Sequence, residues 1–594
     1  MDSPELSYVA GLFVPADNRH FVAYGSVLML LALLHRLSLF RMTMVSVNER
    51  ALLFRAREVK KAASRARSVI WSATSIVAPS ERLVGQEYRF VMFRKVMKCL
   101  WKALTTDWIS IRSPHFHTYF LTREVVEIVL QASQAYKASA LVARAWLVDL
   151  FVGAMVLNCW STPVVAAWFA RRHRVSEPKE SYEKAVVLAL NIVFQIICCM
   201  MFPAVIFLNY YPKYELQTHG FSVDTYYDDA TFVGLVLEGQ MVAPTTIFDF
   251  VSKLLPHWSI YSSVNQVSQC IVRRQQMHAE APSTKPTLTQ PNSSTVWVPM
   301  FERRQRMSVV VHRLMILCGI VVTGVHLHAR LRVWSLDMRG CRKPLNPWGS
   351  SAFPCAVFHV DCRRNSDGSS SDRDFVELNR ESLQALAFVH CPALRAPPVI
   401  RDFRNLQGVN IYNSTLVAWD VESAFDVATQ LQLTYVSFAD VNFTTFPPAL
   451  LDTALPPTLN DMEFSHTNLT TLPSNVTEVW SSLVILFVEF SDLQVIPPTL
   501  LQTNLYWLSL IGNNISNINY QSNARIDGNT NVDAVPTWAT HEHFNGELQM
   551  YGTPYCEQKS PPDGDVATCV VQPIGLFGMY QYSFVKQLYA ADGI

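Results

Sequence analysis

The side chains of this 594-residue chain that could do chemistry are not gathered into any enzyme motif. The sequence has no Gly-rich phosphate loop, no kinase signature, no G-x-S-x-G turn and no H-E-x-x-H helix. His115 with His117 and His541 with His543 form pairs without further ligands, and such pairs belong to solvated loops more often than to metal sites. We therefore expect a protein that is not an enzyme, with no catalytic residue, no metal site and no cofactor.

Five N-x-[ST] sequons follow residue 340, whereas one, at Asn292, precedes it. Clustered sequons indicate an exposed domain that is luminal or extracellular, so we expect residues 341–594 to lie outside the cell. The alternative is that Asn and Ser or Thr simply suit the turn that follows each strand. The expected glycosylation sites are Asn413, Asn442, Asn468, Asn475 and Asn514.

Six cysteines flank the same part of the chain, four near its start and two near its end. An even count at the ends of a domain indicates caps braced by disulfides in an oxidising compartment. We expect Cys556 to pair with Cys569, because these are the two cysteines at that end. The other four allow three pairings, of which we favour Cys341 with Cys355 and Cys362 with Cys391.

Between Leu383 and Ile515 an apolar rhythm repeats six times, with Leu-like residues at positions 1, 4, 6 and 11 of each unit. The starts, at residues 383, 406, 433, 459, 483 and 505, are 22 to 27 residues apart. This period is typical of leucine-rich repeats, in which each unit contributes one short strand to a stacked array. We predict a leucine-rich-repeat solenoid over 383–530, with parallel strands on its concave side and irregular, 3-10 or helical segments on its convex side. A cysteine-containing cap over 341–382 and a cap with tail over 531–594 should close it.

In such an array the residues between the buried leucines of each strand face the concave side. Here those residues are aromatic and acidic, which indicates a protein-binding strip. The alternative is that another segment, such as the carboxy-terminal tail, covers them. No Lys or Arg lies between Arg404 and Arg525, so the strip favours a basic partner. The expected strip residues are Tyr412, Tyr435, Asp461, Glu463, Phe487, Glu489, Phe490 and Trp507.

The first 340 residues read as a multi-pass membrane region. Stretches of about 20 apolar residues can cross a bilayer, and four are found, at about 21–40, 146–170, 185–210 and 308–328. The first is the weakest, because His35 and Arg36 interrupt it, and its alternative is a signal anchor or a buried helix. We reject residues 231–255 as a span because Glu238, Gln240, Pro244 and Asp249 interrupt it, and expect an interfacial or partner-packed helix there.

Charge orients these spans in part. Residues 41–144 hold 18 Lys and Arg against 7 Asp and Glu, so we expect a basic cytoplasmic loop. Its segment 41–67 is either a basic amphipathic helix that holds anionic lipid or a flank that only fixes the topology. A second cytoplasmic loop, with a flexible linker, should cover 211–307. Arg171, Arg172 and Arg174 resist this arrangement, because it puts them outside. Charge alone does not settle the orientation.

Four polar residues lie in or near the spans, namely Asp149, Asn158, Asn191 and Gln195. Polar groups within spans are candidates for function by default. We expect them instead to bond neighbouring helices.

The cap GCRKPLNPWGSSAFPCAVFHVDC (Gly340–Cys362), units containing LTTLP and FTTFPPALL, and the closing YGTPYCEQ (Tyr551–Gln558) resemble a family of oomycete multi-pass membrane leucine-rich-repeat proteins. The resemblance covers about 340–570 and implies a surface protein with an extracellular repeat domain. The sequence after Ile515 departs from the pattern, so a seventh unit is not expected.

Two functions fit these observations. The first is a non-enzymatic recognition, adhesion or receptor-like glycoprotein of the plasma membrane, which binds a protein partner and is anchored in lipid, with no nucleic-acid partner. The second is a channel or transporter subunit with a cytoplasmic repeat domain, since four spans followed by repeats is similar to the plan of volume-regulated anion channel subunits. The sequons and paired cysteines favour the first.

Overall fold

The computed structural model describes two regions of the chain, a helical one and a sheet. The first span expected from the sequence, residues 41–115, most of the linker and Cys569 lie outside the described residues. Those described are 116–172, 177–215, 220–279, 298–335, 339–364, 370, 375–451, 454–497, 500, 505, 507–515, 524–525, 548–550, 553, 556, 567–568 and 580–590.

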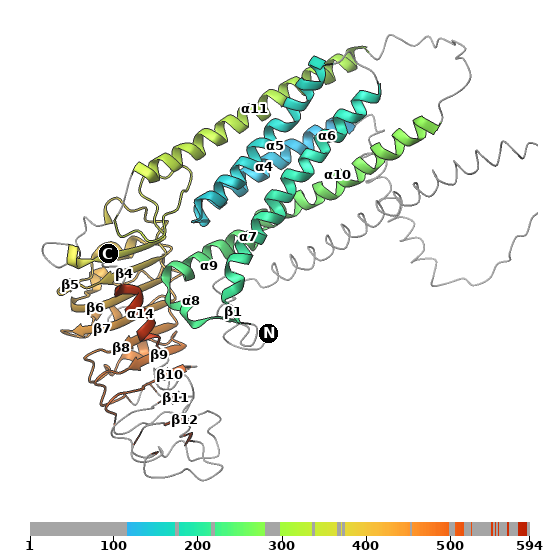
Figure 1. Cartoon of the computed structure of the whole chain (residues 1–594). Coiled ribbons are helices and arrows are strands. Elements are labelled where there is room, and N and C mark those ends of the chain that lie inside the picture. The colour runs from blue at the N-terminus through green and yellow to red at the C-terminus, as the bar shows by residue number, and fades with distance from the viewer. Residues whose placement is uncertain are drawn as a thin grey trace, which may run out of the picture.

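Long helices form a bundle at one end of the molecule (Figure 1). Within the described residues, three helices are long and apolar enough to cross a membrane, Ala145–Arg171, Glu183–Lys213 and Ser308–Ser335. They coincide with three of the four spans expected from hydropathy. The elements that contain them are α5 (Ala145–Arg172), α6 (Glu177–Ile196) with the π-helical turn η2 (Ile197–Met201) and α7 (Phe202–Tyr210), and α11 (Val298–Ser335).

A further helix of the bundle, α4 (Phe116–Leu141), falls where a cytoplasmic loop was expected. This helix packs along α5, α10 and α11, and the cytoplasmic location of these residues stays a prediction. Hydropathy misses α4 since its buried face is polar, with Glu124, Glu127 and Gln131 each less than a tenth exposed. Their partners are side chains of α5 and α6: Asn158 donates to Gln131, and Asn191 and Gln195 donate to Glu127. The spans' amides therefore bond a neighbouring helix, as expected.

Residues 211–307, expected as a second cytoplasmic loop, contain several helices and a hairpin in their described part. After η3 (Tyr211–Lys213) and the hairpin of β1 (Tyr214–Glu215) and β2 (Gly220–Phe221), helices α8 (Val223–Tyr227) and α9 (Asp229–Val242) lie against the sheet, and α10 (Ile247–Ala279) then runs back along the bundle (Figure 1). The α9–α10 pair, bent by 66°, would count as a fourth candidate span if it is one broken span.

Charges that argued against a span at 231–255 are paired in the structure. Arg144 donates to both oxygens of Glu238, at 3.1 and 2.6 Å, and Lys137 contacts Asp249 at 2.6 Å. The interpretation as a partner-packed helix holds for α9, whose buried residues contact α4, α7 and β3.

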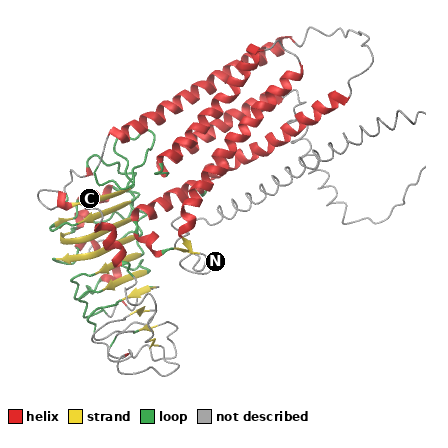
Figure 2. Ribbon diagram, viewed as in Figure 1, coloured by secondary structure: helices red, strands yellow, loops and turns green. Residues whose placement is uncertain are grey.

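The carboxy-terminal half forms an eleven-stranded sheet among the described residues, and every pair within it is parallel (Figure 2). Its main path runs in chain order from β3 to β13, with β5 beside β6. The strands are β3 (Val357–Asp361), β4 (Ala385–Val389), β5 (Leu394–Arg395), β6 (Gly408–Ala418), β7 (Tyr435–Phe443), β8 (Asp461–Ser465), β9 (Ile485–Glu489), β10 (Trp507–Ser509), β11 (Ala524–Arg525), β12 (Leu548–Gln549) and β13 (Ala567–Thr568).

Each of the six sequence units gives one strand of this path, and each strand begins at the third residue of its unit. The register keeps these residues aligned, for example Tyr435 with Asp461 and Asp461 with Ile485. The Leu-like residues at positions 1, 4 and 6 are buried in one apolar core, because alternate strand residues point to the same side. Short segments return on the other side, namely η6 (Pro398–Asp402), η7 (Val421–Ser423), η8 (Pro448–Leu450) and α12 (Val476–Val479).

The sheet extends past the six units at both ends. In the cap, β3 adds a strand before the first unit and is followed by η4 (Cys362–Arg364). Beyond Ile515, where the pattern fades, β11, β12 and β13 continue the parallel pairing. The chain then returns across the sheet as α14 (Tyr582–Ala590), drawn in red in Figure 1.

Candidate functional site on the sheet face

The strip of residues expected to bind a partner lies on one face of the sheet, as the alternation of the strands predicts. The strip is not exposed to solvent, however, because most of its residues are covered. Tyr412 and Phe487 are each 5% exposed and Glu489 is fully buried. Glu463 is buried as well, and the other four, Tyr435, Asp461, Phe490 and Trp507, are half-buried.

The chain's own helices cover the strip. Tyr580, Val585 and Tyr589, in and just before α14, form one apolar cluster with Tyr412 and Phe487. The Tyr412 and Tyr589 rings stack at 5.1 Å between centroids. At the next units along the sheet, the Tyr582 ring stacks on His466. The physical reason is that aromatic side chains exposed on a sheet gain free energy when an amphipathic helix buries them.

Tyrosine hydroxyls donate to carboxylates of the sheet across this interface. Tyr227, at the end of α8, donates to Oε1 of Glu463 at 2.6 Å, and Tyr582 donates to Oδ2 of Asp440, also at 2.6 Å. The backbone N–H of Tyr580 donates to Oε2 of Glu489 at 3.1 Å. A buried carboxylate without such donors would be costly, so these bonds fix the two helices on the strip.

Asp229, the first residue of α9, is the centre of a second set of bonds. Tyr435 donates to its Oδ1 at 2.7 Å, the Asn410 amide lies 2.7 and 2.8 Å from its two oxygens, and Tyr589 donates to Oδ2 at 3.3 Å. Strands β6 and β7, helix α9 and helix α14 therefore meet at one carboxylate.

Two carboxyl groups of this face, those of Asp461 and Glu463, have a raised pKa. Burial raises the pKa of Asp461 and raises that of Glu463 well above its usual range, and the adjacent Asp461 carboxyl adds to the shift of Glu463. Burial likewise raises the pKa of Tyr227 and Tyr580, which keeps both hydroxyls neutral donors. Buried acids and neutral phenols therefore form a hydrogen-bonded interface between the sheet and the two helices.

The sequence did not identify Tyr227, Asp229, Tyr580, Tyr582 and Tyr589 as parts of the site. The sequence of the tail does predict an amphipathic helix. Tyr582, Val585 and Tyr589 recur at intervals of three and four residues and so share one helix face. The Tyr227–Asp229 segment carries no comparable periodicity.

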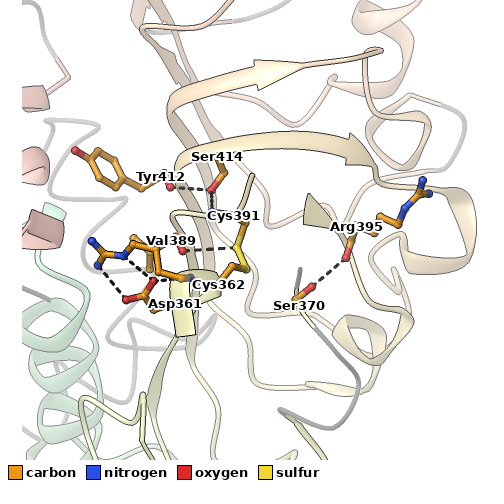
Figure 3. Close-up of a disulfide and its surroundings, with 9 residues drawn as sticks. Asp361, Cys362, Ser370, Val389, Cys391, Arg395, Tyr412 and Ser414 are labelled. Carbon is orange, nitrogen blue, oxygen red and sulfur yellow. Dashed lines mark hydrogen bonds and ion pairs between the residues drawn. A yellow bond between two sulfur atoms is a disulfide. The ribbon is translucent and has the colours of Figure 1, made fainter. Parts of the chain in front are cut away.

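Both disulfides expected at the start of the domain are formed, Cys341–Cys355 and Cys362–Cys391. The second joins η4, after β3, to the turn after β4 (Figure 3). Beside it, Arg363 makes a two-pronged ion pair with Asp361, and the N–H of Cys391 donates to Ser414 at 2.9 Å. Cys556 is also disulfide-bonded, and since Cys569 lies outside the described residues, their pairing stays a prediction.

The five sequon asparagines, Asn413, Asn442, Asn468, Asn475 and Asn514, are all exposed. Two of them also bond within the turns: the Asn468 amide accepts from the N–H of Phe443 at 2.8 Å and donates to its carbonyl at 3.0 Å, and Asn413 lies 2.7 Å from Nδ1 of His390. A role in turns and a role as glycan acceptors therefore both fit these positions.

No protein-family model matches the chain, and no curated protein matches it. Within the described residues, no group of three or more His, Cys, Asp or Glu side chains could hold a metal ion.

Proposed function

We propose that this chain is a non-enzymatic, receptor-like membrane protein whose sheet is a leucine-rich-repeat array that binds a protein partner. Two features support the repeat assignment. The strands of all six units start at the same position, and the eighth residue of every unit has a positive φ, at residues 390, 413, 440, 466, 490 and 512. A repeated backbone conformation at a repeated position is what a repeat architecture requires. Membership of the oomycete family suggested by the cap remains part of this proposal.

The orientation that we propose has the sheet outside the plasma membrane. Helix α5 begins near the sheet and ends at Arg172, on the far end of the bundle, and α11 runs from that far end back to the sheet (Figure 1). Arg171, Arg172, Arg303, Arg304 and Arg306 then all belong to the far, cytoplasmic end. Because Arg144, Lys213, Arg330 and Arg332 lie at the sheet end, charge near the spans does not decide the orientation, and the proposed orientation rests on the sequons and the disulfides.

The observation that carries the proposal is the occupied strip. Its aromatic residues pack against a Tyr-bearing amphipathic helix, α14, and its Glu489 accepts a hydrogen bond from the N–H of Tyr580, just before that helix. We infer that α14 holds the strip closed and that a partner replaces it. Such a partner should present hydrogen-bond donors to the carboxylates, from tyrosines or from basic side chains.

A labelled peptide of residues 579–594 tests whether the strip exchanges its occupant. Val585, on the buried side of α14, is replaced by Asp in the full chain, so that a buried charge destabilises the docked helix. The Val585→Asp chain should bind the peptide at least tenfold more tightly than the unaltered chain, as measured by fluorescence anisotropy in detergent.

Gln587→Ala, on the exposed side of the same helix, is the matched control and should behave as the unaltered chain. Adding Trp507→Ala to Val585→Asp should weaken peptide binding by about 2 kcal/mol, as loss of a central aromatic does. Equal peptide binding by all four chains would contradict a strip that exchanges its occupant.

A further inference from the structure

Helix α4 is built in the reverse way to a water-exposed helix. Its carboxylates face the other helices, since Glu124 and Glu127 are both buried. Nε of Arg123 lies 3.1 Å from Oε1 of Glu127, and Lys137 contacts Asp249 of α10 at 2.6 Å. A helix at a water boundary buries its apolar side and exposes its charges, so the inner side of α4 is polar where such a helix would be apolar.

The opposite side of α4 is apolar and exposed. Val125, Val126, Val129 and Tyr136 lie within this helix at spacings of one, three and seven residues, so they share one side. Val129 and Tyr136 are 59% and 57% exposed. None of the Asp, Glu, Lys and Arg side chains between residues 119 and 141 is exposed. A helix keeps its charges inside and its apolar side chains outside where its surroundings are hydrocarbon.

Contacts with α5 place α4 at the depth of a candidate span. Asn158 of α5 donates to Gln131 at 3.2 Å, and Thr162 donates to Glu124 at 2.8 Å. Asn158 is the middle residue of the span Ala145–Arg171. A helix rises about 1.5 Å per residue, so Gln131 lies roughly 20 Å from the level of either end of that span. With α5 across the membrane, the middle of α4 lies near the centre of the bilayer.

Contacts with α6 give the same depth. Asn191 and Gln195 donate to Glu127 at 3.3 and 2.9 Å, and both lie inside the span Glu183–Lys213. Helix α4 has 26 residues. It is therefore about 39 Å long, which exceeds the roughly 30 Å of hydrocarbon in a bilayer. Its length is sufficient for a crossing.

The two ends of α4 lie at opposite ends of the bundle. At its carboxyl end, the N–H groups of Asn346 and Trp348, in the cap of the sheet, donate to the carbonyl and the hydroxyl of Ser139. Helix α5 starts soon afterwards, at Ala145, and runs back beside α4. The chain therefore enters α4 at the far end of the bundle and leaves it at the sheet (Figure 1).

We propose that α4 crosses the membrane beside α5, with its exposed apolar side, formed by Val125, Val126, Val129 and Tyr136, against lipid acyl chains. The chain reaches α5 at the sheet end, so a loop that ran to residue 144 without a crossing would share the side of the sheet. A crossing by α4 puts the start of this helix at the far end, which agrees with the cytoplasmic location expected for the basic segment before it. The crossing rests on α5 and α6 being spans, and it does not depend on the recognition function of the strip.

A photoreactive benzophenone amino acid in place of Val129 tests what this side contacts. The full chain is reconstituted in phosphatidylcholine vesicles, and irradiation couples the benzophenone to the C–H bonds that it touches. Leu157 on α5 and Leu431 on the sheet domain, 53% and 56% exposed, are the matched reference positions. Position 129 should give a lipid adduct in a yield similar to that of position 157 and many times that of position 431, as measured by mass spectrometry.

Val129→Asp provides a second measurement, because Asp at the centre of a spanning helix opposes insertion. It should lower the yield of folded chain in the vesicles severalfold. Val129→Leu should keep the yield of the unaltered chain, and so should Leu431→Asp, since exposed positions in water tolerate such changes.

Three results would overturn the crossing. The first is a lipid adduct at position 157 without one at position 129, together with a Val129→Asp chain that folds as the unaltered chain does. The second is a cross-link from position 129 to protein alone, which would show that another segment or a second copy covers this side. The third is a lipid adduct at neither position, because α5 would then not be a span.

Discussion

A single backbone conformation recurs at the eighth residue of every one of the six units. His390, Asn413, Asp440, His466 and Phe490 have φ between 45° and 57°, a region that side chains with a Cβ rarely adopt. Polar residues tolerate it best, and Phe490, the exception, stacks on His466 at 5.1 Å. In the sixth unit the position is glycine, Gly512, at φ 67°.

Gly512→Ala should destabilise the end of the sheet for two reasons. The left-handed conformation costs a Cβ-bearing residue about 1–2 kcal/mol, and the new Cβ would lie 2.5 Å from Cδ1 of Phe490. Gly349→Ala is the matched control, because Gly349 has φ 81° but open space around it, so only the conformational cost applies. Hydrogen exchange of β9 and β10 should accelerate well beyond tenfold in the first variant, whereas equal effects in both would contradict the steric argument.

Glu463→Gln should change stability in a pH-dependent way. The pKa of Glu463 is raised in the fold above its ordinary value of 4.5, so its contribution is complete below about pH 4.5 and is lost as pH rises through the folded pKa. Glutamine imitates the protonated acid at every pH. The variant should therefore match the unaltered chain at pH 4 and protect α14 from hydrogen exchange severalfold better at pH 8.

Asp420→Asn, at an exposed carboxyl, should show no such difference between the two pH values. Equal protection of α14 in Glu463→Gln and the unaltered chain at pH 8 would mean that Glu463 is ionised in the fold without cost.

At the scale of elements, sequence periodicity predicted the strands well, because buried leucines at fixed positions set both the strand starts and their register. Hydropathy likewise predicted the apolar helices α5, α6–α7 and α11. It could not predict α4, whose buried Glu and Gln side chains are satisfied by side chains far away in sequence. Nor could it predict the closed strip, since the partners of Glu463 and Glu489 come from residues 227 and 580. Local patterns encode elements, whereas docking between distant elements depends on geometry that no local pattern records.

The disulfide Cys362–Cys391 should stabilise the first two strands of the sheet. It spans 29 residues, against 14 for Cys341–Cys355. Replacing both Cys362 and Cys391 by Ala should lower the local stability of β3 and β4 by about 2–4 kcal/mol, measured by hydrogen exchange. The Cys341→Ala and Cys355→Ala pair should cost about 0.6 kcal/mol less, because doubling a loop adds that much closure entropy. A larger loss from the shorter loop would show that packing, not loop closure, dominates.

At the scale of the whole molecule, basic side chains lie at both ends of the bundle. The far end carries Arg171 and Arg172 of α5, and the end that meets the sheet carries Arg144, Arg330 and Arg332. Charge near the spans therefore does not orient the protein. Because α8 docks on the sheet through Tyr227, α8 and the sheet share one side of the membrane, which we propose to be the outside.

Labelling of single introduced cysteines in intact cells decides this topology. Asp224→Cys, exposed on α8, should react with a membrane-impermeant maleimide, because α8 docks on the sheet that we propose to be extracellular. Ala170→Cys, exposed at the far end of α5, should react only after the cells are permeabilised. The unaltered chain measures the background from native cysteines, and a glycosidase-induced gel shift should accompany the labelling, since all five sequon asparagines are exposed. If Ala170→Cys reacts before permeabilisation and Asp224→Cys does not, the proposed orientation is wrong and the sheet is cytoplasmic.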